Sequence, residues 1–145
     1  MIQIENTKTV LMISPELKDN GAYTSNTGID TKGYKHLRVI MAVGATDIAT
    51  TAAPALAEST AVGGTYTAIT VPTTAALADA ISATEDGGIF IIDVDLTQAR
   101  ERFIKCLVTA GDGTAGTALA VIGILSKPDA GTISISAGAT EAIIA

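Results

Sequence analysis

Apolar and acidic side chains alternate between residues 89 and 96, which read Ile-Phe-Ile-Ile-Asp-Val-Asp-Leu. Successive side chains of an extended strand point to opposite faces, so the apolar residues at even positions share one face, and Asp93 and Asp95 share the other. An amphipathic helix repeats every 3.6 residues and would not separate them in this way. The Gly87-Gly88 pair just before the segment is typical of a turn. These residues therefore predict a strand with one buried face.

Similar short strands recur along the chain and are separated by turn residues instead of helices. The sequence predicts further strands over residues 8–13, 36–43, 65–71, 103–110 and 117–126. The connections are rich in Gly, Asn and Asp, residues that accept turn conformations without strain. We therefore predict an all-β chain, an antiparallel β-sandwich that is jelly-roll-like and has about seven to nine strands.

Two segments are ambiguous at this level. Residues 51–59 are rich in Ala, and Pro54 allows them at most an edge strand, because proline cannot donate to the hydrogen-bond ladder. Residues 73–84 favour either a short helical turn or a loop, since Ala favours helix but no long amphipathic pattern supports one.

The 145 residues suit one domain. We expect a single β-sandwich over residues 1–136 and a C-terminal arm or last strand over 137–145, where Ile143 and Ile144 form an apolar tip after small residues. The tip would dock on a neighbouring molecule or end the same subunit, and both readings stay open. No basic-then-apolar leader and no run of about 18 apolar residues is visible, so we expect a protein made in the cytoplasm without an export route.

The charge balance limits the classes of partner. Nine Lys and Arg stand against fifteen Asp and Glu, a formal net charge of −6. Sequence-independent binding to nucleic acid needs clustered cations to neutralise phosphates, and anionic membranes attract basic segments. We therefore expect neither nucleic acid nor a membrane as a partner.

Residues that carry chemistry are few. His36 is the only histidine, which excludes a cluster of histidine ligands for a metal within one chain, and no serine lies in a G-x-S-x-G context that would make it a nucleophile. Cys106 is the only cysteine, and its apolar neighbours indicate a buried, inert side chain. We therefore expect no enzyme activity, no catalytic residues, no metal and no cofactor.

Two other patterns have a functional and a structural interpretation. Asp93 and Asp95 would suit paired-carboxylate hydrolysis or Ca²⁺ binding, but a solvated strand face that discourages edge pairing is the preferred interpretation. Residues 111–116 match the dinucleotide pattern G-x-G-x-x-G. That pattern must open a helix, whereas residues 117–125 are predicted to form a strand, so no nucleotide site is expected.

Two predicted strands are too apolar to have one wet face. Along residues 37–43 and 119–125 both faces are largely apolar, whereas a strand with one solvated face should alternate. Cover by a loop or by another subunit would explain this, and both remain open. We predict that the outer faces of these strands and the C-terminal tip form a contact surface. Its candidate residues are Leu37, Val39, Ile40, Met41, Leu119, Val121, Ile122, Ile124, Ile143 and Ile144.

The segment Asp-Thr-Lys-Gly-Tyr at residues 30–34, with the strand after it, resembles part of a group of small virion proteins of tailed bacteriophages. The matching segments are residues 30–34, 36–43, 89–96, 100–102 and 108–116. The resemblance covers the chain from about Asp30 to Leu125 and rests on turns and strands, so the two ends carry no match. It implies a jelly-roll or sandwich decoration (cement) protein of the kind encoded among head-assembly genes, and it carries over no catalytic residue.

The resemblance implies a structural role. A decoration protein would bind the outside of a capsid lattice as a dimer or trimer, with the major capsid protein and itself as partners, and be located in the virion. Many weak contacts repeated over the lattice would stabilise the shell. The alternatives are a tail- or neck-associated virion protein and a carbohydrate-binding sandwich. The last is disfavoured because such modules present aromatic side chains, and this chain has no Trp, three Tyr and two Phe.

Overall fold

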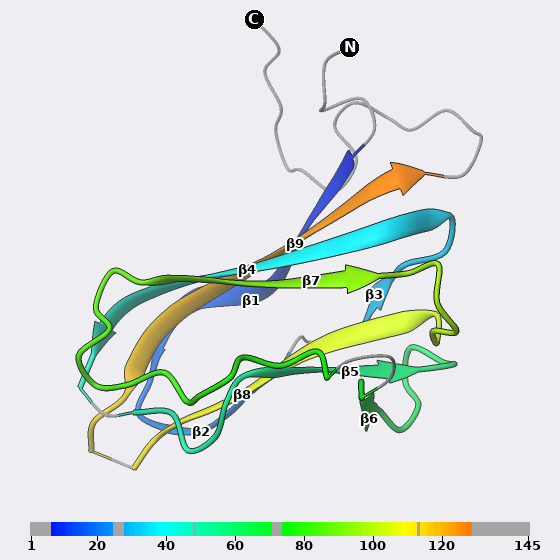
Figure 1. Ribbon diagram of the computed structural model, residues 1–145. Helices are drawn as coiled ribbons and strands as arrows, with labels where there is room; N and C mark the ends of the chain where they lie inside the picture. The colour runs from blue at the N-terminus through cyan, green and yellow to red at the C-terminus, as the bar shows by residue number, and fades with distance from the viewer. Residues whose placement is uncertain (1–6, 25–27, 48, 71–73, 113, 129–145) are drawn as a thin grey trace, which may run out of the picture.

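The computed structural model describes residues 7–24, 28–47, 49–70, 74–112 and 114–128. Within these ranges every regular element is a strand, and the strands form two antiparallel sheets that pack face to face (Figure 1). The first sheet has the order β1 (Thr7–Lys18), β9 (Thr117–Pro128), β4 (Tyr34–Thr46) and β7 (Ile89–Asp95). The second has the order β2 (Asn20–Thr24), β8 (Phe103–Gly111), β5 (Ala55–Ser59) and β6 (Thr67–Ala68), and β3 (Ile29–Asp30) also pairs with β8.

The strand order is that of a jelly roll. β2 and β3 pair with successive parts of β8 and together act as one interrupted strand, so the nine strands of the described residues count as eight. The chain passes from the first sheet to the second and back, and the sheets read 1-9-4-7 and 2-8-5-6. Two Greek keys wound together give this arrangement. The predicted antiparallel, jelly-roll-like β-sandwich is confirmed.

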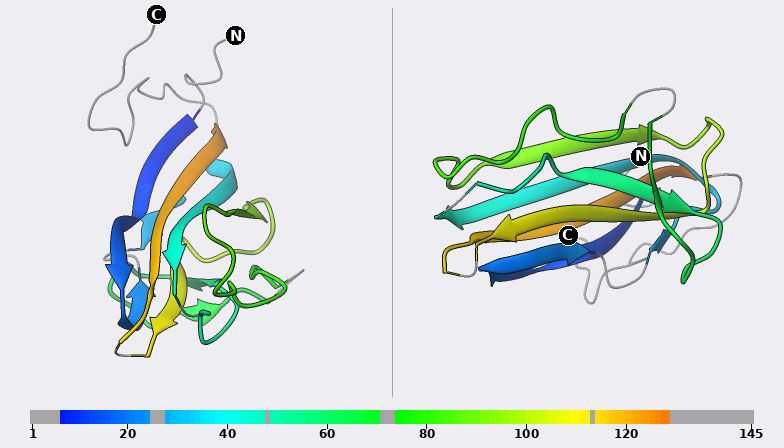
Figure 2. Two further views of the ribbon diagram at one scale, coloured as in Figure 1. Left: turned by 90° about the vertical axis from the view of Figure 1, so that its left-hand side faces the viewer. Right: turned by 90° about the horizontal axis from the view of Figure 1, so that it is seen from below.

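The core lies between the two sheets (Figure 2). Along β4, buried residues alternate with more exposed ones, so that Leu37, Val39 and Met41 all point inward and are fully buried. Leu56 of β5 and Ile104 of β8 belong to the same core cluster and are fully buried too. Aliphatic side chains dominate this interior, in keeping with the low aromatic content of the sequence. The alternation fixes which face of each sheet is left for other contacts.

Cys106 lies on the inner face of β8 and is fully buried, as its apolar neighbours predict. Burial disfavours the charged thiolate and raises the pKa of this thiol to about 12. Because the thiolate is the reactive form of cysteine, Cys106 is inert in the folded chain. It fills space in the core as a small hydrophobic residue would.

The prediction for residues 51–59 is wrong about the position of the strand. β5 lies inside the second sheet, paired with β8 on one side and with β6 on the other. Pro54 precedes the strand and so removes no ladder hydrogen bond, while its carbonyl accepts a hydrogen bond from the backbone N–H of Leu77 at 2.9 Å. β6 is shorter than the predicted strand over residues 65–71.

Residues 74–84 form a loop, which was one of the two structures predicted for residues 73–84. The loop packs down onto the sandwich, because Ala75 and Ile81 are buried. The carbonyl of Ala75 accepts a hydrogen bond from the N–H of Leu56 at 2.7 Å, and the N–H of Ala75 donates to Ile69 at 3.0 Å. These hydrogen bonds attach the loop to β5 and to Ile69, the residue that follows β6.

Candidate functional site

β4 and β9 are the two central strands of the first sheet, and one face of each points into the core. The contact residues predicted on that face are at most 3% exposed: Leu37, Val39, Met41, Leu119 and Val121. The prediction that they contact a partner is wrong, because they pack against the second sheet of the same chain. A sequence with two apolar faces does not tell which face the fold turns inward.

The other predicted residues of these strands lie on the outer face of the sheet. Ile122 is 39% exposed, and Ile40 and Ile124 are partly buried among their neighbours on that face. Ile143 and Ile144 lie outside the described residues, so the predicted role of the C-terminal tip remains a prediction. The outer face of the sheet, directed away from the second sheet (Figure 1), is therefore where a contact surface has to be sought.

A row of large aliphatic side chains crosses the whole outer face. The strand register aligns Leu11 of β1 with Ile122 of β9, Ile122 with Ile40 of β4, and Ile40 with Ile91 of β7. Paired residues of an antiparallel sheet stand on the same face, close enough to touch. We call these four residues the large row. Sequence analysis found its two central members but missed Leu11 and Ile91, because the alignment exists only across strands.

A second row lies two residues further along the strands. Ala42 of β4 stands between Ala120 of β9 and Ile89 of β7, and we call these three residues the small row. Leu17 of β1, paired with Ala118, extends the apolar surface beyond it. The two rows together with Leu17 form what we call the apolar face. Of the seven exposed large hydrophobic residues in the described chain, five lie there: Leu11 (55%), Leu17 (61%), Ile89 (69%), Ile91 (49%) and Ile122 (39%).

Charged residues border the large row on its other side. The guanidinium of Arg38 donates two hydrogen bonds to Asp93, from Nε to Oδ1 at 2.8 Å and from Nη2 to Oδ2 at 2.9 Å. These bonds hold the pKa of Asp93 below its usual range. Asp95 accepts hydrogen bonds from Thr97 and Gln98, which lower its pKa to about 2. Each aspartate has its own donors, so the two do not form a proton-sharing pair of the kind used in acid–base catalysis.

The D-T-K-G-Y segment at residues 30–34 contacts the charged turn at residues 100–102. Arg102 binds Asp30 through two hydrogen bonds, from Nη2 to Oδ2 at 2.6 Å and from Nε to Oδ1 at 2.9 Å, and this lowers the pKa of Asp30 to about 2. The backbone and the hydroxyl of Thr31 both donate to the carbonyl of Arg102. Gly33 has a φ of 85°, which a residue with a side chain rarely adopts. The D-T-K-G-Y segment is thus a structural turn.

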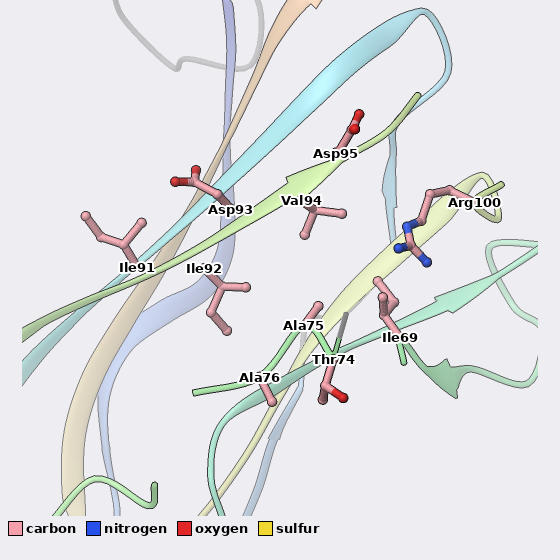
Figure 3. A pocket seen from close by; sticks show the side chains of 10 residues that line it. All are labelled: Ile69, Thr74, Ala75, Ala76, Ile91, Ile92, Asp93, Val94, Asp95 and Arg100. Carbon is pink, nitrogen blue, oxygen red and sulfur yellow. The ribbon is translucent and has the colours of Figure 1, made fainter. Parts of the chain in front are cut away.

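A cavity of about 330 Å³ opens between β7 and the loop around Thr74 (Figure 3). Aliphatic and polar residues both line it. The carboxylates of Asp93 and Asp95 point away from it, whereas the guanidinium of Arg100 points into it. The Arg100 side chain is 7% exposed, and its Nη1 lies 3.5 Å from Oε1 of Glu58, so its charge is buried beside a carboxylate. Among the described residues, no aromatic side chain lines the cavity, which disfavours a sugar-stacking site. A second cavity of about 400 Å³ is lined by Ser, Thr and Glu side chains near β5 and β6.

The register brings together three residues that sequence analysis did not connect. His36 lies between Ser126 and Asp93, with Nδ1 3.1 Å from the serine Oγ and Nε2 3.2 Å from the aspartate Oδ1. This order resembles a catalytic triad. However, Ser126 is paired with strands on both sides and lines neither cavity, and Asp93 is held by Arg38. A hydrolase needs a substrate cleft and donors for the oxyanion beside the nucleophile. The three residues form a hydrogen-bonded network on an open sheet surface.

Two further features bear on function. Among the described residues, no group of three or more His, Cys, Asp and Glu side chains is placed to hold a metal ion. Nor does this part of the chain contain a helix with the length and apolar character needed to cross a membrane. Comparison of the sequence with models of protein families and with curated proteins finds no match. Fold and surface therefore carry the functional interpretation.

Proposed function

We propose that this chain is a non-enzymatic structural protein that binds the outside of a tailed-phage capsid and stabilises its lattice. The observation that carries the proposal is the apolar face, which gathers on one sheet five of the seven exposed large hydrophobic residues in the described part of the chain. Contiguous exposed apolar surface of this kind marks a site of association. A chain that has such a face and few residues suited to catalysis would act by binding other protein subunits.

The resemblance, together with the fold, supports the capsid as the proposed partner. Jelly rolls occur in viral capsid proteins, lectins and cupins, so the fold by itself does not choose among these functions. The chain resembles decoration proteins in its turn segments, and an aromatic-free cavity disfavours the lectin-like alternative. The proposed partners are the major capsid protein and further copies of the chain, and the net charge of −6 disfavours nucleic acid and membranes. The proposed location is the surface of the virion.

Binding to capsids tests the proposal directly. We expect the purified chain to pellet with empty capsids of the phage that encodes it, and to saturate at a fixed ratio to the major capsid protein. Ile122→Lys places a charge in the middle of the apolar face and should weaken pelleting at least about tenfold. Repeated contacts are lost together whether this face touches the capsid itself or joins copies that bind the capsid together. Val62→Lys is the matched control, since Val62 is 47% exposed but lies in a loop off that face. Binding to purified tails or necks and not to capsids would favour the tail-associated alternative instead.

The non-enzymatic part of the proposal has a separate test at Ser126. Removing the nucleophile of a working triad costs about a thousandfold or more in rate. We expect hydrolysis of p-nitrophenyl acetate by the wild type and by Ser126→Ala to agree within about twofold. We also expect a fluorophosphonate probe, which modifies activated serines, to leave Ser126 unlabelled. Labelling at Ser126 that disappears in His36→Ala would show an active triad and contradict the proposal.

A further inference from the structure

We infer that the apolar face of one chain packs on the same face of a second copy, forming a dimer with a twofold axis between the large row and the small row. The inference rests on the proposed structural role only in treating this face as a contact surface. It names the occupant of the face, which the capsid-binding proposal leaves open. It also separates the dimer from the trimer as the unit of assembly, because two faces that pack on each other close as a pair.

The area of the face matches what a stable dimer needs. The exposed fractions of its five most exposed residues add up to between two and three fully exposed aliphatic residues. With the partly buried Ile40, the alanines of the small row and the neighbouring Ile124, the apolar surface is roughly 500 Å². This is in the upper part of the range for the largest apolar patch of a monomer, and such patches are often functional. A standard interface buries about 800 Å² on each partner, about three-fifths of it apolar, which is also about 500 Å². One such face therefore supplies the apolar part of one standard interface.

The arrangement of large and small residues makes the face complementary to itself. A twofold axis that runs across the strands, between the two rows, turns the large row of one copy onto the small row of the other. Ile40 then lies over Ala42 of the second copy, Ile122 over its Ala120, and Ile91 over its Ile89. One row further out, Ile124 lies over Ala118. Large residues thus meet small ones, as they do where packed layers interdigitate.

The strands of two sheets packed in this way stay roughly aligned, as in ordinary sheet-on-sheet packing with a spacing of about 10 Å. The inner face of the same sheet already packs on a second sheet through residues of the same kind. The outer face repeats that chemistry on the other side of β4 and β9. This accounts for the two apolar faces of these strands, one used within the chain and one between chains.

The charged border suits a partner of the same sign. Each chain carries a net charge of −6, so two copies repel at long range. On the border of the face, however, Arg38 and Asp93 neutralise each other through two hydrogen bonds. This pair lies in the same row as Ile124, the outermost row of the proposed interface. The proposed axis places Arg38 opposite Gly44 of the second copy, which has no side chain. No unpaired charge from this pair is then buried by dimer formation.

The test is the mass of the full chain in solution, measured by sedimentation over a range of concentrations and without capsids. We expect a dimer of the wild type that dissociates on dilution. Ile40→Ala removes a large side chain and leaves a gap over Ala42 of the second copy. Ala42→Ile adds a large side chain that collides with Ile40 of the second copy. Each variant alone should therefore raise the dimer dissociation constant at least about tenfold. The double variant exchanges large for small on both copies and should return the dissociation constant to within about threefold of the wild type.

Leu107→Ala is the matched control, because Leu107 is 36% exposed on the outer side of the second sheet and should leave the dimer unchanged. Circular dichroism of each variant checks that it folds. A wild type that stays monomeric overturns the inference, and so does a dimer that neither single variant weakens or that the double variant fails to restore. If the wild type is monomeric but a variant that carries both Ile143→Ser and Ile144→Ser forms a dimer, the chain's own C-terminal residues cover the face. Capsid pelleting is measured separately and can succeed in each of these cases.

Discussion

Replacing Leu37 by Ala is expected to lower the free energy of unfolding by about 3–4 kcal/mol. Leu37 is fully buried on β4, a central strand of the first sheet. It lies close to Gly123 of the neighbouring strand, where an added Cβ would stand 3.4 Å from the Leu37 Cδ1. Truncation would remove transfer free energy and leave a cavity between strands that are paired on both sides and have little room to collapse.

The matched control for this variant is Leu107→Ala. It makes the same chemical change in a central strand of the other sheet, but on the outer face, where Leu107 is 36% exposed. We expect its loss to be about 1 kcal/mol, since less apolar surface returns to water and no cavity forms. Urea denaturation followed by far-ultraviolet circular dichroism measures both midpoints. Equal losses would contradict the position of Leu37 in the core.

Replacing Gly116 by Ala is expected to cost about 2–3 kcal/mol, although the change adds only one methyl group. The added Cβ would overlap the backbone carbonyl of Lys18 and stand 2.7 Å from the Cα of Asp19. These contacts are with backbone, which cannot rotate out of the way as a side chain would. The carbonyl of Gly116 also accepts a hydrogen bond from the N–H of Asp47 at 2.9 Å. Three connections of the jelly roll meet at this residue, so a shift in one disturbs the others.

Gly63→Ala provides the control for Gly116. An added Cβ at Gly63 meets no atom within 4 Å, and this glycine lies in an exposed turn. We expect its free energy of unfolding to stay within about 0.5 kcal/mol of the wild type, or to rise slightly because alanine restricts the unfolded chain. The two urea midpoints are compared in the same buffer. A Gly116→Ala chain as stable as Gly63→Ala would show that the three connections do not touch as described.

Two glycines of the literal G-x-G-x-x-G match, Gly111 and Gly116, have structural roles, and Gly113 lies outside the described residues. Gly111 ends β8 with a φ of 83°, and Gly116 allows the close approach of the chain near Lys18. The strand predicted after the match is present as β9, where a dinucleotide site would need a helix. Glycines at these spacings can therefore be required by backbone conformation and close backbone contacts, with no bound ligand.

Local patterns were sufficient for the class of fold. Period-two alternation identified β7 almost to the residue, and turn-forming residues separated most of the other strands. These signals are local, because the direction of each side chain follows from the extended backbone alone. They failed at β5, where Pro54 suggested an edge, because a proline just before a strand and a proline within it look alike in a sequence.

The amino-acid sequence by itself determined that the chain forms apolar, alternating strands in an all-β sandwich, and that β4 and β9 have two apolar faces. Only the tertiary structure decided which of these faces is the core, since Leu37 and Ile40 look equally suited to burial. The tertiary structure also brings together the four residues of the large row, from Leu11 to Ile91, because the strand register aligns residues that are far apart along the chain. Burial and register arise from packing between strands, and no single strand contains that information.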